Sequence, residues 1–340
     1  MENYIGLDAH SKTCTFVVLD AAGEITKTGT IGTSERNLRE MVRSITGTKA
    51  LVVEEANIAQ WVFLTLKDEV DRLVVCHPAY LPKKSGPKND FRDSLHLAQQ
   101  LRSGNVTPVH HEDSFLMNLR SMVTAYETVN VRGATLKNQF KSLLRHEGIT
   151  AESAHLTVTN PDKWKEIKNP VKRFVAENLY QQICENEAIK KKYVREFRVN
   201  ILENKTVRNL ASIPAIGHTR AHIIAAYICT GERFESKHKL WSYAKLVRHR
   251  DESDGYVIRK RTPHGRSELK AAFMGAAQRI VISKTKTALQ DYYWYLREQK
   301  GLDEKKSRRA LARKIAAICL MVMKKGTKYD DDIVRKSFDN

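Results

Sequence analysis

Cysteine is scarce and unpatterned in this sequence, which has 5 cysteines among 340 residues. No two of them form a CxxC pair, and no group of cysteines and histidines has the spacing of zinc ligands. The pattern indicates neither a disulfide framework nor a zinc site, and it favours a reducing, cytoplasmic setting. The five are Cys14, Cys76, Cys184, Cys229 and Cys319.

Long apolar runs are also missing. The longest, IAAICLMVM at residues 315–323, has nine residues, which is about half of what a helix needs to span a bilayer. The first residues do not show the basic-then-apolar order of a secretory signal. We therefore expect no membrane role.

Acidic residues are too few to balance the basic ones. The chain has 58 Lys and Arg against 39 Asp and Glu, a formal net charge of +19. The excess is confined to one part, since residues 1–110 carry 13 basic and 13 acidic residues and residues 111–340 carry 45 and 26. A strongly basic segment is typical of proteins that bind nucleic acid. The neutral first part is expected to do something other than bind phosphate.

Seven short segments at the start of the chain suggest a fold. Apolar, β-branched runs predict strands, and runs with apolar residues every three or four positions predict helices. The order is strand, strand, strand, helix, strand, helix, strand. It matches the ribonuclease H-like fold, an antiparallel meander extended by parallel strands with helices on both faces. The segments are residues 4–7, 13–20, 23–31, 33–45, 50–56, 58–70 and 72–77.

Longer helices follow these segments. After a stretch with two prolines and a glycine at residues 82–87, the run DFRDSLHLAQQLRSG predicts a helix over residues 90–104. Apolar residues at helical spacing then predict two long helices, residues 114–146 and 170–203. We expect these two to form a coiled-coil-like pair, either antiparallel or intermolecular.

Three domains are expected from these elements. The first, residues 1–112, is the α/β ribonuclease H-like domain. The second, residues 113–205, is the long helical, coiled-coil-like region. The third, residues 206–340, is mostly α-helical and basic, and we expect it to bind DNA.

Acidic residues in the first domain fall where its elements begin or end. Asp8 ends the first strand, Glu54 and Glu55 end the fourth, and Asp90 and Asp93 lie three apart at the start of a helix. Alone, each is more typical of a turn or a solvated helix face. In a ribonuclease H-like sheet, however, the first and fourth strands are neighbours and the last helix packs across them. Four carboxylates would therefore converge.

Such a cluster repels itself unless cations occupy it, and hard oxygen ligands suit Mg²⁺ or Mn²⁺. Two ions about 3.5–4 Å apart would clamp the attacking and leaving oxygens of a phosphodiester. We therefore predict a catalytic metal site made of Asp8, Glu55, Asp90 and Asp93. Glu55 is preferred to Glu54, although strand alternation directs only one of the two at the site.

The motifs YIGLDAHS, VVEEAN and GPKNDFRDSLHLA resemble those of the DEDD-type transposases of bacterial insertion sequences. That family is related to Piv-type DNA invertases, and its catalytic domain is like that of RuvC-type Holliday-junction resolvases. Its motifs are a strand ending in Asp, a sequence close to Glu-Ala-Thr-Gly, and one close to Lys-Thr-Asp-x-x-Asp-Ala. The resemblance assigns the metal to the same four carboxylates. The second motif departs from the family at Asn57 and Ile58, where Thr and Gly are usual.

The resemblance continues in the basic half. LASIPAIGHTRAHIIAAYI, residues 210–228, is similar to the helix-hairpin-helix-like segment that opens the family's C-terminal transposase domain. In such a segment, exposed amides and a helix N-terminus can meet a phosphate backbone. Ala215 stands where the family usually has glycine. An ordinary helical hairpin is the alternative interpretation.

The run RHRDESDGYVIRKRTPHGR, residues 248–266, is the densest basic stretch, and it matches a loop of the family. In family members a serine of this loop acts as the nucleophile and forms a transient phosphoserine link to DNA. The matching residue is Ser253, which nothing but the resemblance separates from Ser236, Ser242 or Ser267. Six basic residues of the run are predicted phosphate contacts: Arg248, Arg250, Arg259, Lys260, Arg261 and Arg266.

Aromatic residues occur both before and after this loop in the sequence. Trp241, Tyr243 and the DYYWYL run at residues 291–296 could stack on unpaired bases. Core packing is the commoner role of aromatic side chains. We therefore expect them in the core.

The resemblance implies a DNA transposase or site-specific recombinase that cuts and rejoins the strands of an insertion sequence. It further implies two divalent ions, a dimeric or tetrameric homo-oligomer, and a structured non-coding guide RNA that pairs with target and donor DNA. It also implies a bacterial cytoplasmic location with nucleoid association during the reaction. A Piv-like invertase or a RuvC-like junction nuclease would share the same site.

Two other classes of protein are alternatives. Sugar kinases and actin-like ATPases also begin with a ribonuclease H-like strand and loop, but they need a second Gly-rich phosphate loop in a repeated domain. Only SDGY is a candidate for that loop, and it lacks the repeat. A non-catalytic nucleic-acid-binding protein would not need four carboxylates at one sheet end.

Overall fold

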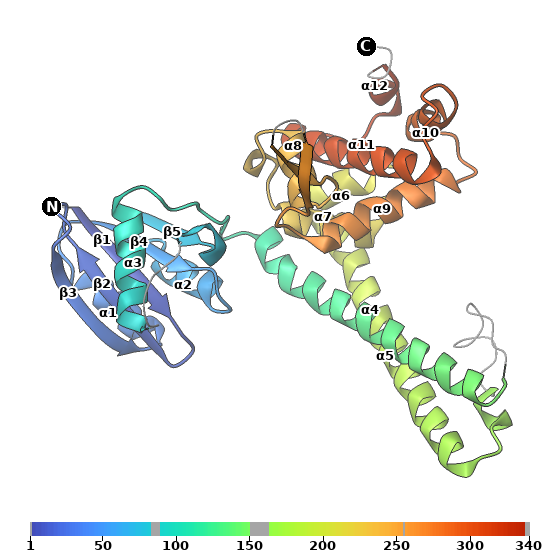
Figure 1. Ribbon diagram of the computed structural model, residues 1–340, viewed down its shortest axis with the longest axis horizontal. Coiled ribbons are helices and arrows are strands. Elements are labelled where there is room, and N and C mark those ends of the chain that lie inside the picture. Colours follow the sequence, from blue (N-terminus) through green and yellow to red (C-terminus); the bar gives the residue numbers. More distant parts are fainter. Residues whose placement is uncertain (1, 83–88, 150–162, 254–255, 337–340) are drawn as a thin grey trace. The chain divides into compact units, whose positions relative to one another are not determined.

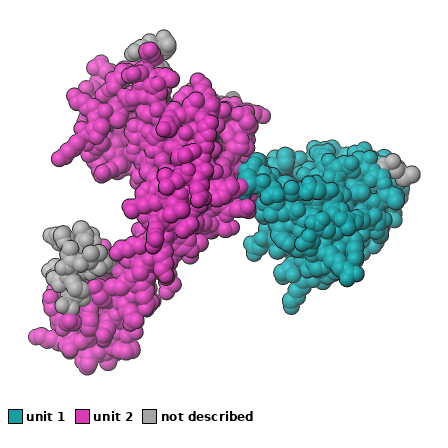
Figure 2. Space-filling model, turned by 180° about the vertical axis from the view of Figure 1, so that it is seen from behind, with its two compact units in different colours: residues 1–114 teal, residues 115–340 magenta. Residues whose placement is uncertain are grey.

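The computed structural model describes residues 2–82, 89–149, 163–253 and 256–336. The chain forms two compact units, Met1–Ser114 and Phe115–Asn340, which are coloured separately in Figure 2. The first unit is a sheet with helices, and the second is mostly helical (Figure 1). The predicted fold class, an α/β ribonuclease H-like domain followed by a mostly α-helical region, is confirmed.

The sheet of the first unit has five strands in the order β3-β2-β1-β4-β5. The first three strands pair antiparallel, and β4 and β5 continue the sheet beside β1 as parallel strands. The predicted parallel contact between the first and fourth strands is therefore present. The strands are β1 (Glu2–Ala9), β2 (Thr13–Leu19), β3 (Ile25–Gly32), β4 (Thr48–Glu54) and β5 (Arg72–Cys76).

Side chains alternate between the two faces of this sheet, and each face has its own helices. On one face, Leu7 and Val53 pack in an apolar cluster with Leu38 of α1 and Val62 of α2. On the other face, Val52 belongs to a cluster with apolar residues of α3, which crosses the sheet in Figure 1. The helices of this unit are α1 (Glu35–Arg43), α2 (Ala59–Leu66), the short η1 (Pro78–Tyr80) and α3 (Asp90–Arg102).

Gly6 of β1 is a point of close approach between the sheet and α3. A Cβ at this position would lie 2.0 Å from the main-chain oxygen of Ser94 and 2.6 Å from the main-chain nitrogen of Ala98. The hydroxyl of Ser94 donates to the carbonyl of Thr15 at 2.8 Å, which ties the helix to β2. Because the obstructing atoms belong to helix main chain, they can move only with the whole helix. Gly6 therefore sets how closely α3 lies on the sheet.

Gly6→Ala should destabilise the first unit by about 3 kcal/mol, the upper part of the range for overpacking. Chemical or thermal unfolding measures this loss. Gly32→Ala is the matched control, because the nearest heavy atom to its added Cβ is the end of the Asn37 side chain at 3.3 Å. Equal losses in the two variants would contradict this account of the contact.

Two long helices open the second unit, α4 (Phe115–His146) and α5 (Pro170–Glu203). They run antiparallel within one chain (Figure 1), so one of the two predicted arrangements is present. The rings of Tyr126 and Phe197 meet edge-on with centroids 5.2 Å apart, and Lys137 forms an ion pair with Glu187 on the same two helices. Among the described residues, no helix is long and apolar enough to cross a membrane.

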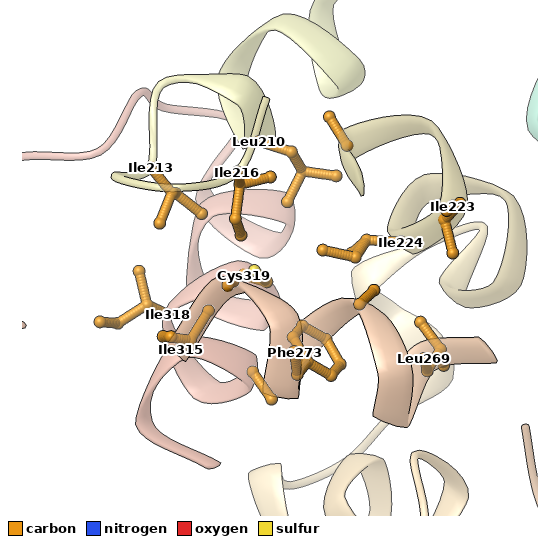
Figure 3. Close-up of a cluster of buried hydrophobic side chains, with 14 of the residues drawn as sticks. Leu210, Ile213, Ile216, Ile223, Ile224, Leu269, Phe273, Ile315, Ile318 and Cys319 are labelled. Carbon is orange, nitrogen blue, oxygen red and sulfur yellow. The ribbon is translucent and has the colours of Figure 1, made fainter. Parts of the chain in front are cut away.

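The helices that follow α5 share one core with parts of α4 and α5. Ile224 of α7, Phe273 of α9 and Ile315 of α11 are fully buried in it (Figure 3). A two-stranded hairpin, β6–β7, is the second sheet. The elements are η2 (Lys163–Glu166), α6 (Lys205–Ala211), α7 (His218–Ile228), η3 (Gly231–Arg233), α8 (Lys237–Tyr243), β6 (His249–Ser253), β7 (Tyr256–Arg261), α9 (Ser267–Val281), α10 (Ala288–Glu298), α11 (Glu304–Lys325) and α12 (Asp331–Lys336).

Candidate active site

Asp8 lies near the carboxyl end of β1, on the face of the sheet that α3 covers, because Gly6 two residues earlier faces that helix. Asp8 is 9% exposed. Its Oδ2 lies 3.3 Å from Nε2 of His10. The tight turn between β1 and β2 holds His10 there, since the main-chain nitrogen of His10 donates to the carbonyl of Thr13 at 3.0 Å. Asp8 is thus a nearly buried carboxylate at a strand end.

Asp90 and Asp93 lie in the first turn of α3, where the sequence predicts them. The helix begins here because Asn89 caps it, its side chain accepting from the main-chain nitrogen of Phe91 at 2.8 Å. The helix dipole favours acidic residues in that turn. Ligand atoms of Asp8, His10 and Asp90 all lie within 4.8 Å of one another. The structure therefore brings Asp8 and Asp90 together.

The charge of Asp8 is only partly balanced. Burial raises the pKa of Asp8 most, the facing His10 lowers it, and the charges of Asp90 and Asp93 raise it again. The net pKa is above the ordinary value for Asp. A cluster of this kind needs a positive partner, and oxygen donors of this type prefer Mg²⁺ or Mn²⁺. The residues present therefore fit a divalent cation.

The two glutamates at the end of β4 face opposite sides of the sheet. Val52 packs in the cluster with α3, whereas Val53 packs in the cluster with α1 and α2. Glu54 pairs in register with Cys76, and the main-chain nitrogen of Glu55 still donates to the carbonyl of Cys76 at 2.7 Å. The alternation therefore continues through both glutamates. It places Glu54, rather than Glu55, on the face of Asp8.

Glu55 has a partner elsewhere. Its Oε2 lies 2.6 Å from Nε2 of His111, whose Nδ1 lies 2.6 Å from Oε1 of Gln60. The Gln60 amide nitrogen donates to the carbonyl of Glu112 at 3.1 Å, which turns Oε1 toward the ring. Both ring nitrogens of His111 thus face side-chain oxygens, and the hydrogen bond to the Glu55 carboxylate is charge-assisted. Strand geometry favours Glu54 as the fourth carboxylate, whereas the family motif assigns Glu55.

His10 and His111 each contact a predicted metal ligand, and the sequence predicted neither histidine. His10 follows Asp8 by two residues in a short polar turn, and this proximity was the one available signal. His111 is 56 residues from Glu55, and only the fold brings the two together. Each of these histidines contacts a predicted metal ligand and can orient its carboxylate.

The hairpin before α7 has a left-handed backbone conformation at Ala215 and carboxyl groups beside the helix that follows it. Ala215 has a φ of 63°, in the left-handed region that favours the glycine usual at this position. A cavity of about 400 Å³ beside the start of α7 is lined by Gly217, Glu127 and Glu268. Burial raises the pKa of Glu127, and the charge of Glu268 raises it further. Two carboxyl groups beside the helix N-terminus oppose the predicted phosphate contact, whereas Arg220, which lines the same cavity, favours it.

Ser253 is the last residue of β6, at the tip of the β6–β7 hairpin. Arg248 is exposed, as a phosphate contact would be. Arg266 instead stacks over the buried ring of Tyr227, with Cζ 5.5 Å from the ring centroid, so it also supports the core. The side chain of Ser253 lies outside the described part of the structure, as do those of four predicted phosphate contacts, Arg250, Arg259, Lys260 and Arg261.

Two family models match the chain. A DEDD transposase model of the IS110 group, described as a transposase, matches residues 5–147, which include the sheet and the acidic residues. A model described as the transposase IS116/IS110/IS902 family matches residues 207–294, which include the hairpin before α7 and the β6–β7 loop. A comparison with curated proteins gives no match. On these two matches, the chain belongs to the DEDD-type transposases of insertion sequences.

Proposed function

We propose that this transposase cuts and rejoins DNA strands by metal-dependent phosphodiester transfer at the acidic site of its first unit. The convergence of Asp8, His10 and Asp90, with ligand atoms within 4.8 Å of one another, carries the proposal. Asp93 lies close enough for its charge to raise the pKa of Asp8. A phosphodiester is itself an anion, so carboxylates alone would repel it. Divalent cations remove this conflict.

Asp8, Asp90, Asp93 and one glutamate at the end of β4 would hold two Mg²⁺ or Mn²⁺ ions. Bound there, the ions would polarise the phosphodiester and stabilise charge on its attacking and leaving oxygens. The chain keeps its ligands in place through neighbouring contacts. The Asn89 cap fixes the start of α3, and His10 holds one oxygen of Asp8.

We propose Ser253 as the nucleophile, on the strength of the family resemblance of its loop. Its Oγ would attack the phosphorus and form an O–P bond while the bond from phosphorus to the leaving sugar oxygen breaks. The serine proton passes to that leaving oxygen. A sugar hydroxyl of the second strand then attacks the phosphoserine, and the serine recovers a proton as it leaves. The basic residues of the same loop would bind the flanking phosphates.

A homo-oligomer and a guide RNA complete the proposal. Exchange of two DNA strands needs more than one copy of the acidic site and of Ser253, which supports a dimer or a tetramer. The family resemblance supports a second polyanion besides DNA, and the net charge of +19 permits it. We propose that it is a structured non-coding RNA that pairs with target and donor DNA.

Incubation with element-end DNA in Mg²⁺ or EDTA, with and without candidate RNA, tests the proposed activity. Strand cleavage and a covalent protein–DNA adduct are expected in Mg²⁺ only. Joining of element ends to a target marks transposition, whereas inversion between two sites marks a Piv-like invertase and cleavage of four-way junctions a RuvC-like nuclease. Equal cleavage in EDTA would refute the metal-dependent mechanism.

Glu54→Gln should lower Mg²⁺-dependent cleavage by about 100-fold, the upper range for losing a group that supports a metal site. This loss is expected because Glu54 lies on the same face of the sheet as Asp8. Glu55→Gln should lower cleavage much less, and should instead cost about 1–3 kcal/mol of unfolding free energy because His111 loses a charged partner. The opposite pattern would support the assignment by family motif, and would require the end of β4 to shift by one residue.

A further inference from the structure

A cavity of about 540 Å³ in the second unit is lined by residues of α8, α10, α11 and α12. Its volume lies within the range of small-ligand sites, about 300–1,000 Å³. No carboxylate is among its described lining residues. Two aromatic and three basic side chains line it: Trp241, Tyr292, Lys237, Arg313 and Lys314. The mechanism proposed above uses none of the five.

Helix α11 forms one wall of the cavity, and core packing fixes its orientation. Lys314, Ile318 and Met321 line the cavity at the spacing of one helix face. On a neighbouring face, Ile315 and Cys319 are fully buried in the core of this unit (Figure 3). Because that second face is packed, α11 cannot turn to close the cavity.

The rings of the cavity have cations beside them. The indole nitrogen of Trp241 donates to the carbonyl of Arg313 at 2.8 Å, which fixes the ring. The Lys237 ammonium and the Arg313 guanidinium lie 5.8 and 5.7 Å from the Trp241 ring centroid. The Lys314 ammonium lies 5.7 Å from the ring centroid of Tyr292. Flat apolar faces and positive charge thus occur side by side.

These cations repel one another. Burial lowers the pKa of Lys314, and the charge of Lys237 lowers it further. Cation–π attraction to the two rings acts against that repulsion. An anion placed among Lys237, Arg313 and Lys314 would lessen their mutual repulsion, and a flat group attached to the anion would cover the rings.

We propose that this cavity binds one unpaired nucleotide of a nucleic-acid strand. The base stacks against Trp241 or Tyr292, since every base has a flat π-face. Its phosphate lies among Lys237, Arg313 and Lys314, whose donors suit phosphate oxygens. An acidic peptide would also attract these cations but would leave two aromatic walls without a matching surface. The inference rests on the proposed nucleic-acid chemistry, but this binding needs neither the acidic site nor a metal.

Binding of labelled single strands to the full-length protein in EDTA, followed by fluorescence anisotropy, tests the inference. DNA and RNA strands of the same sequence are separate arms, and a preference for one identifies the source of the nucleotide. Lys237→Gln and Lys314→Gln should each weaken single-strand binding about tenfold. Fully paired duplex should lose much less. Lys300→Gln is the matched control, because Lys300 lies 5.6 Å from the ring centroid of Tyr295 and does not line the cavity.

Photo-crosslinking identifies directly which residues the base contacts. A strand carrying 5-iodouracil should crosslink to Trp241 or Tyr292, as mapped by mass spectrometry of the peptides. Native single-strand affinity in both lysine variants, or crosslinks solely to other residues, would overturn the inference. Tighter binding of an acidic peptide than of either strand would also overturn it. Since the assay contains no Mg²⁺, failure of the proposed strand cleavage leaves its result unchanged.

Discussion

Asp8→Asn is expected to abolish Mg²⁺-dependent strand cleavage, with a loss of at least about 100-fold. Asn keeps the size of the side chain but removes the negative charge that a divalent cation requires. Asp8 is the most buried of the predicted ligands and faces both Asp90 and His10, so the other carboxylates cannot replace it. Cleavage of end-labelled element DNA measures the effect.

Folding must be separated from chemistry in this experiment. Burial raises the pKa of Asp8 most, and the charges of Asp90 and Asp93 raise it further, so Asp8→Asn should leave the metal-free protein at least as stable as the native chain. Asp68→Asn is the matched control, because the Asp68 side chain is 81% exposed and lies outside the acidic cluster. If Asp8→Asn protein cleaves DNA at the native rate, the acidic site is not the catalytic centre.

Ser253→Ala is expected to remove the covalent protein–DNA adduct completely, since alanine has no oxygen to bond to phosphorus. The adduct is detected as a labelled strand that stays with the protein after denaturation. DNA binding should change little, because the basic residues of the loop are retained.

Ser267→Ala is the control for this variant, because Ser267 is exposed at the start of α9, outside the β6–β7 hairpin. It should form the adduct as the native protein does. An adduct that persists in Ser253→Ala protein would show that another residue is the nucleophile.

The strands and helices of the first unit were predictable because each has a signal in its own stretch of sequence. Apolar runs separated by turn residues predicted the strands, and the Asn89 cap marks the start of α3. The neighbouring positions of β1 and β4 follow from the fold that this element order indicates. In the structure, ligand atoms of Asp8 and Asp90 lie within 4.8 Å of each other.

Side-chain direction at the end of β4 was not predictable. Two adjacent glutamates point to opposite faces, and a shift of one residue in a strand exchanges them. Only the register of β4 with its neighbours, and the hydrogen bond between His111 and Glu55, separate the two. His111 and Glu55 are 56 residues apart, and a contact between such distant residues leaves no periodic signal in the sequence.

The expectation that the aromatic residues are core residues holds only in part. Tyr293 is buried, but Trp294 and Tyr295 are 46% and 45% exposed, and Trp241 lines a cavity. Successive residues of a helix point about 100° apart, so an unbroken aromatic run cannot face one core. Its exposed members had to be found in the structure.

Calorimetric titration of Mn²⁺ into the full-length protein tests most directly whether Asp8, Asp90 and Asp93 form a metal site. The native protein should bind Mn²⁺, and Asp8→Asn should weaken that binding by at least about tenfold, while Asp68→Asn should not. Equal Mn²⁺ affinity in native and Asp8→Asn proteins would contradict the proposed site.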